Sequence, residues 1–112
     1  MNSEINYTIT EYDGIKIIKL IGNISNTTKV EFERIVNSIS QKSDVILNMN
    51  EISIITSGGL SSLVKVSAEA RKRRRRVMIM GLREGLVKML EVMGALQYII
   101  FIENIEEGLS KT

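Results

Sequence analysis

Residues that could do chemistry gather at two places in this sequence. The first is the turn Thr56-Ser57-Gly58-Gly59, and the second is a run of six basic residues, Arg71-Lys72-Arg73-Arg74-Arg75-Arg76. A hydroxyl beside two glycines suits helix capping or contact with a phosphate, and a basic run suits binding to anions. These two segments are therefore the candidate functional sites.

The residue types that the sequence lacks exclude several kinds of chemistry. There is no Cys, which rules out disulfides, thiolate metal sites and a cysteine nucleophile. There is no His either, so the commonest general base and the commonest transition-metal ligand are missing. No group of Asp and Glu residues has the spacing of metal ligands. We therefore expect no catalytic residue, metal site or cofactor, and predict that the protein is not an enzyme.

The Ser57 turn lies between a predicted buried strand and a predicted helix. The first N–H groups of a helix lack partners within the helix and carry partial positive charge, so Ser57 could cap them in an ordinary tight turn. Gly58 and Gly59 are poor helix formers, and their lack of a side chain would let another surface approach the backbone. The patterns G-x-x-x-x-G-K-[ST] and G-x-G-x-x-G of nucleotide-binding loops are absent, so we expect no small-molecule ligand.

The basic run cannot lie on one helix face, because neighbouring residues of a helix are about 100° apart. We expect the helix after Ser57 to end near Lys72 to Arg74, with Arg75 and Arg76 leading into the next strand. Cations suit a helix C-terminus, so a solvated helix end is the simplest interpretation. An acidic protein surface, a nucleic acid or an anionic membrane could also use the run. Nucleic-acid binding is an alternative function that we do not favour, because no aromatic residues are interleaved for stacking.

The length favours a single domain over residues 1–112, since one hydrophobic core usually serves a chain of this length. The formal charge is +2, but outside the basic run nine basic residues face thirteen acidic ones, a net charge of −4. The first residues do not resemble a signal peptide, and no apolar run approaches the ~20 residues of a membrane span. We therefore expect a cytoplasmic protein without a transmembrane segment.

The first half of the chain predicts a β-hairpin, a helix and a buried strand. Apolar and polar residues alternate over 5–11 as in a half-buried strand, Asp13-Gly14 suits a tight turn, and 15–21 continues as the partner strand. Val45-Ile46-Leu47 is continuously apolar, which is typical of a central strand covered on both faces. The helix between them should begin at Thr27 or Thr28. Its candidate caps are Ser25, Asn26 and Thr27, and its core-facing residues are Phe32, Ile35, Val36 and Ile39.

The second half predicts alternating helices and strands. A helix should follow Ser57, a strand should span 77–80, and a helix over 82–93 should end at Gly94. A last strand should span 98–102, and a short helix or a frayed tail closes the chain. The methionines expected to fill the core are Met78, Met80, Met89 and Met93. The order β-β-α-β-α-β-α-β predicts an α/β fold with one mixed sheet and helices packed against it.

The centre of the pattern is a hydrophobic strand that leads within a few residues to Thr56-Ser57-Gly58-Gly59-Leu60. Together with the opening hairpin and the later elements, it resembles the STAS domain family, whose bacterial anti-sigma factor antagonists carry Asp-Ser-Ser-Gly-Leu or a close variant there. The resemblance implies that Ser57 stands where the family has its phosphorylatable serine. It also implies that the unmodified protein binds an anti-sigma factor of the serine kinase type, and that phosphorylation of Ser57 ends the complex.

The resemblance further implies a docking rim around Ser57. Its residues are Asn23, Ser25, Asn26, Thr56, Ser57, Gly58 and Gly59. Asn23, Ser25, Asn48 and Thr56 stand where the family is often acidic, and Gly58 replaces a second serine. The loss of charge is either drift among solvated residues or a change in partner choice, and Thr56 is a second candidate for phosphorylation. A phosphorylation-independent STAS scaffold or transporter-accessory subunit is the alternative function within the family.

Overall fold

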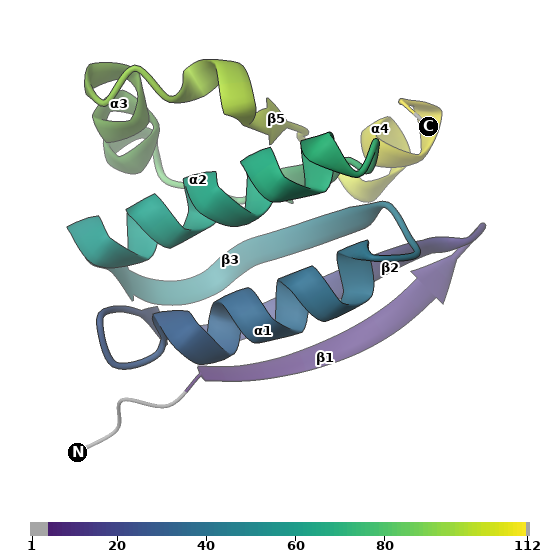
Figure 1. Cartoon of the computed structure of the whole chain (residues 1–112), viewed down its shortest axis with the longest axis horizontal. Helices are drawn as coiled ribbons and strands as arrows, with labels where there is room; N and C mark the ends of the chain where they lie inside the picture. Colours follow the sequence, from purple (N-terminus) through teal and green to yellow (C-terminus); the bar gives the residue numbers. More distant parts are fainter. Residues whose placement is uncertain (1–4, 112) are drawn as a thin grey trace.

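The computed structural model describes residues 5–111, which form one five-stranded sheet with helices packed on it (Figure 1). The strands are β1 (Ile5–Tyr12), β2 (Ile15–Ile24), β3 (Val45–Ile55), β4 (Val77–Met80) and β5 (Ile100–Phe101). The helices are α1 (Lys29–Ser40), α2 (Ser57–Lys72), α3 (Glu84–Val92), the 3-10 helix η1 (Leu96–Tyr98) and α4 (Ile105–Ser110). The predicted α/β class and its order of strands and helices are confirmed, and the closing segment is the helix α4.

The strands lie side by side in chain order, with β1 antiparallel to β2 and the other neighbours parallel. Tyr12 pairs with Ile15, so Asp13 and Gly14 form a two-residue turn in which both have positive φ, 52° and 82°. This geometry matches the twist of a hairpin and favours Asp-Gly, as the sequence predicted. Because the remaining strands are parallel, their carboxyl ends point toward the same end of the molecule.

Helices α1 and α2 lie next to each other across one face of the sheet (Figure 1). Apolar side chains from α1, α2 and the sheet fill the space between these layers, with Phe32 and Leu63 fully buried. On the opposite face, α4 packs over a smaller cluster around Ile46 and Met78. Val45-Ile46-Leu47 therefore lies between two apolar layers, which confirms the prediction of a central strand.

The predicted hairpin strands differ from the observed ones in burial and length. Strand β1 is not half-buried, because it lies at the edge of the sheet and only Ile5 is partly covered; Tyr7 and Ile9 are 38% and 43% exposed. Strand β2 does not stop at Ile21, because an irregularity in its pairing, with Gly22 at φ 119°, lets the strand continue for three more residues. The last strand, predicted over 98–102, has only two residues.

Helix α1 begins after Thr28, and none of its three predicted caps holds the N-cap position. The Thr28 hydroxyl donates a hydrogen bond to the Asn23 carbonyl at 2.8 Å and accepts one from the Ser25 N–H at 2.9 Å. This side chain braces the connection from β2 and does not cap the helix N–H groups. The predicted core-facing residues are correct, since Phe32, Ile35 and Val36 are buried.

Candidate functional site

The Ser57 turn joins the end of β3 directly to the start of α2. Thr56 is the N-cap: its hydroxyl accepts a hydrogen bond from the Gly59 N–H at 3.1 Å, and its carbonyl accepts one from the Leu60 N–H at 2.8 Å. Ser57 is the first residue of the helix, so the prediction that Ser57 itself caps the helix is wrong by one position. The strand-to-helix turn with Ser57 at its tip is confirmed.

Ser57 is exposed, and its hydroxyl has no hydrogen-bond partner within residues 5–111. It lies at the positive end of a 16-residue helix whose first turn contains no acidic residue. By contrast, the Thr56 hydroxyl is half-buried and engaged as the cap. The two hydroxyls are therefore not equivalent, and only that of Ser57 is free to react or to contact a partner.

Both glycines lie in close contact with the protein itself, and at Gly59 the contact is with backbone, which cannot move aside as the Asn26 side chain beside Gly58 can. A Cβ on Gly58 would lie 2.0 Å from the Asn26 Oδ1, and a Cβ on Gly59 would lie 2.2 Å from the Ile24 carbonyl oxygen. The surface that approaches the bare turn is thus the protein's own β2–α1 connection. Gly59 is buried beneath this connection, so it supports the predicted rim without belonging to its exposed surface.

The β2–α1 connection and the Ser57 turn lie side by side because β2 and β3 are parallel and paired up to Ile24 and Ile55. The Thr56 N–H donates a hydrogen bond to the Ile24 carbonyl at 3.0 Å, which fixes the two segments together. The structure therefore gathers most of the predicted rim into one surface. In it Asn26 and Ser57 are exposed, and Asn23, Ser25, Thr56 and Gly58 are half-buried.

Asn48 does not lie at this tip. It precedes Thr56 by eight positions, or about 26 Å of extended strand. It shares the α4 face of the sheet with Ile46, since alternate residues of a strand point the same way. Its side-chain oxygen accepts hydrogen bonds from the Asn50 N–H at 3.0 Å and the Asn50 side-chain amide at 2.8 Å. Of the four residues at often acidic positions, Asn48 therefore does not bear on the charge around Ser57.

Comparison with known proteins agrees with this arrangement. The sequence model of the STAS domain matches residues 6–108. The chain belongs to the STAS domain family. No sequence of a curated protein matches this STAS domain.

Solved structures with a similar fold include an anti-sigma factor antagonist from Mycobacterium paratuberculosis, with a TM-score of 0.78, 14% identity, and 96% and 92% of the two chains covered. The Bacillus cell fate determinant SpoIIAA in its phosphorylated form has a TM-score of 0.69 and 13% identity, with 95% and 98% covered. The murine anion transporter Slc26a9 has a TM-score of 0.73 and 16% identity over 89% of this chain and 18% of that one. At these identities the likeness shows the shared fold.

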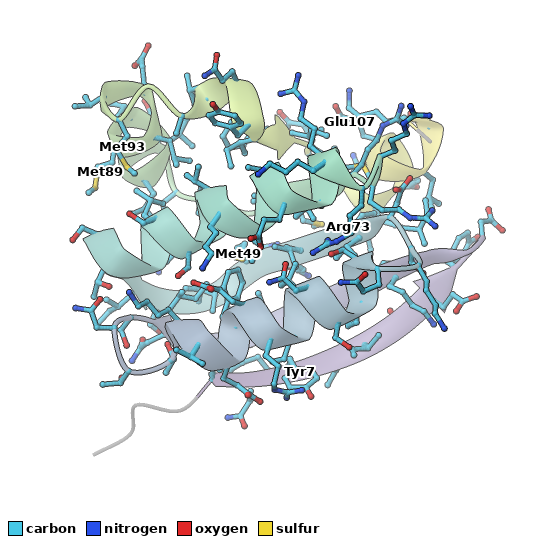
Figure 2. All side chains as sticks on the ribbon, viewed as in Figure 1. Tyr7, Met49, Arg73, Met89, Met93 and Glu107 are labelled. Atoms are coloured by element: carbon cyan, nitrogen blue, oxygen red, sulfur yellow. The ribbon has the colours of Figure 1, made fainter. Side chains whose placement is uncertain are left out.

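Helix α3 of the STAS domain carries an apolar surface that the sequence did not predict. Met89 and Met93 are 43% and 46% exposed and Val92 is 89% exposed, so the expectation that both methionines fill the core is wrong. Only Leu90 of this helix is buried, because the short helix contacts the core along one narrow line. Met89 and Met93 lie toward the same end of the long axis as the start of α2 (Figures 1 and 2). The sequence did contain a signal for this surface, because the apolar residues of α3 spread around more of the helix than one buried face can hold.

The basic run lies at the other end of α2, about 24 Å from Ser57 by the rise of the helix. The helix ends at Lys72, as predicted, and the rest of the run leads to β4. The Arg73 guanidinium donates a hydrogen bond to the Ser40 hydroxyl at 2.9 Å, which ties α2 to the end of α1 (Figure 2). None of the helices between residues 5 and 111 has the length and apolar composition that a membrane span requires.

Replacement of Thr56 by Val should destabilise the STAS domain by about 1 kcal/mol, because the shape is kept while the Gly59 N–H loses its acceptor. Ser57→Ala should change the free energy of unfolding little, since the Ser57 hydroxyl bonds to no described residue. Urea denaturation of both variants measures the difference. A larger loss for Ser57→Ala than for Thr56→Val would contradict the assignment of the cap.

Glu33 links α1 to α2 and should make stability depend on acid pH. Its carboxylate accepts a hydrogen bond from the Ser62 hydroxyl at 2.5 Å and lies 3.2 Å from the Lys65 ammonium. Partial burial acts to raise the pKa of Glu33, but those hydrogen bonds and the charges of Lys65 and Lys29 outweigh it and lower the pKa below its usual value. The contribution of the Glu33 carboxylate to the free energy of unfolding is therefore complete at neutral pH and is lost as the pH falls below about 4.5.

In Glu33→Gln the free energy of unfolding should accordingly fall by about 1 kcal/mol less than in wild type when the pH is lowered from neutral to acid. Glu91→Gln is the matched control, because Glu91 is exposed on α3 and forms no ion pair within the described residues. Thermal unfolding measured across this pH range compares the two variants. Identical pH profiles would show that the Glu33 contacts do not contribute.

Proposed function

We propose that this STAS domain is a regulatory protein of the anti-sigma factor antagonist type. It docks through the Ser57 rim onto an anti-sigma factor of the serine kinase type and is released when that partner phosphorylates Ser57. It acts in the cytoplasm by binding, without catalysis or a cofactor. The observation that carries the proposal is the exposed Ser57 hydroxyl at the helix tip, which bonds to nothing in the described part of the chain, while the neighbouring Thr56 hydroxyl is held as the cap.

The similar structures support the same class of function. SpoIIAA, described as an anti-sigma factor antagonist, is known in unphosphorylated and phosphorylated forms with this fold. The exposed surface of Met89, Val92 and Met93 adds a second support, because a contiguous apolar patch favours contact with another protein. Since Met89 and Met93 lie toward the same end of the molecule as the start of α2, where Ser57 stands, one partner could cover both surfaces (Figures 1 and 2).

Electrostatics explains how phosphorylation of Ser57 would act as a release signal. A phosphoserine adds about −1.5 to −2 charges. The N-terminus of α2 offsets only about 0.3–1 kcal/mol of that at an exposed site, whereas an unpaired charge inside an interface costs several kcal/mol. The penalty at the interface exceeds the gain at the helix, so the phosphate expels the partner and leaves the fold unchanged.

A phosphorylation-independent scaffold or transporter-accessory subunit is the second candidate. The likeness to Slc26a9, an anion transporter, favours it, because the same fold occurs there within a much longer chain. The first turn of α2 contains no acidic residue. The charge around Ser57 therefore differs from that of family members with an acidic residue beside the serine. In this case the rim would bind its partner whether or not Ser57 carried a phosphate.

Incubation with ATP and the kinase-type anti-sigma factor encoded in the same genome distinguishes the two candidates. The proposal predicts one added phosphate, located on Ser57 by mass spectrometry and missing from Ser57→Ala. Thr56 should stay unmodified, because phosphorylation there would remove the cap of α2. A protein that gains no phosphate, or gains it elsewhere, would exclude the phosphoswitch and favour the scaffold.

A further inference from the structure

The end of α2 that lies far from Ser57 borders a pocket of about 410 Å³. The pocket opens between this helix end and the segment around η1, at the start of β4 and β5. Its polar lining is supplied mainly by Arg71, Arg74, Arg75, Arg76, Gln97 and Tyr98. Four of the six residues of the basic run therefore line one concave surface, in which Arg71, Arg74 and Arg76 are exposed and Arg75 is half-buried.

The backbone at the helix end brings these arginines together. The Arg75 N–H bonds to the Ala70 carbonyl and the Arg74 N–H to the Arg71 carbonyl, which is the pattern of a Schellman motif. Arg74 occupies the left-handed position of this motif, at φ 62°. Glycine is the residue usually found there, because an L side chain is strained at positive φ. This chain therefore has an arginine at a position where glycine would be less strained.

The positive charge in the pocket is not neutralised within residues 5–111. None of the four arginines forms an ion pair there, and the guanidinium groups of Arg74 and Arg75 have no hydrogen-bond partner. Arg71 and Arg76 each donate to a backbone carbonyl, of Gln97 and Lys111.

Two acidic residues, Asp44 and Glu107, lie next to Arg76 or its partner Lys111 and form no ion pair with the pocket arginines. Asp44 accepts a hydrogen bond from the backbone N–H of Arg76, and Glu107 lies 3.7 Å from the Lys111 ammonium and accepts the Glu103 N–H. Several N–H donors on four guanidinium groups are therefore available to an anion in the pocket.

We propose that this pocket binds a small molecule with two or more adjacent phosphate groups. Planar guanidinium groups match phosphate oxygens in pairs, and several negative charges are needed to complement four arginines. The volume lies within the range of small-molecule sites. The partly exposed Tyr98 ring could cover an organic part of the ligand. The site is separate from the Ser57 rim and does not depend on the function proposed for it.

Titration calorimetry with tripolyphosphate, ATP and sulfate tests this site in the intact protein. Tripolyphosphate should bind one per chain and more tightly than sulfate. Arg74→Gly with Arg75→Gln should weaken binding of tripolyphosphate by about tenfold or more. The fold should survive this change, because glycine suits the Arg74 position. Arg75→Gln alone leaves the helix end unaltered and should weaken binding by about threefold.

Lys42→Gln with Lys72→Gln is the matched control. It removes the same charge from the ends of α1 and α2 without touching the pocket lining, and should cost less than about threefold in affinity. If ATP binds more tightly than tripolyphosphate, the ligand of the pocket is a nucleotide. If the two bind equally, the pocket recognises the phosphate chain alone. Both results support the site. Equal losses in the two double variants, equal affinity for sulfate, no binding at millimolar concentrations, or tighter binding of a single-stranded oligonucleotide would each overturn it.

Discussion

Replacement of Gly59 by Ala should destabilise the protein by about 3 kcal/mol, the largest stability effect that we expect from a single methyl group. The added Cβ would lie 2.2 Å from the Ile24 carbonyl oxygen and 2.7 Å from its carbon, so backbone and not a flexible side chain would have to move. That movement would separate β2 from the start of α2 and disturb the Thr56 N–H bond to Ile24. Thermal unfolding should show a fall in Tm of more than about 10 °C.

Gly85→Ala is the matched control for this substitution. Gly85 also lies near the start of a helix, but no atom of another described residue that could clash lies within 4 Å of the position that its Cβ would take. Alanine there should leave the stability unchanged or raise it by up to about 1 kcal/mol, because alanine is the better helix former. Equal Tm values for Gly59→Ala and wild type would show that the turn does not pack on the β2–α1 connection as described.

A negative charge on Ser57 should have the largest effect on partner binding. Phosphorylation should weaken the complex with the anti-sigma factor by about 100-fold or more, since burying an unpaired charge costs several kcal/mol and each ~1.4 kcal/mol is tenfold. Ser57→Asp carries less charge and should weaken it by about tenfold. Ser57→Ala should bind within about threefold of wild type, because alanine adds no charge to the interface and breaks no hydrogen bond within residues 5–111.

The local part of the site could be predicted from the sequence. A buried strand followed by small polar residues and glycines indicates a strand-to-helix turn, because these residue types cap helices and tolerate close contacts. The same signals did not distinguish Thr56 from Ser57 as the cap, since both carry a hydroxyl suited to the role. The length of β3 decides between them, and that length depends on pairing with β2.

The features that could not be predicted from the sequence depend on contacts between segments far apart in the chain. Nothing local indicates that Gly58 and Gly59 face Asn26 and Ile24. The continuous apolar run before Asn48 hides the alternation of β3, so the face of Asn48 emerges only from its pairing with neighbouring strands. The pocket beside the basic run likewise depends on η1, of which only the last residue, Tyr98, was assigned to an element, as the start of a strand.

The central claim is that the state of Ser57 controls docking, and one binding measurement tests it most directly. The unmodified protein, the protein phosphorylated on Ser57 and Ser38→Asp are each titrated with the anti-sigma factor. Ser38 is exposed near the opposite end of α1, so its variant adds charge away from the rim. We predict that the phosphoprotein alone loses about 100-fold in affinity. Equal affinity of the phosphorylated and unmodified proteins would contradict the account.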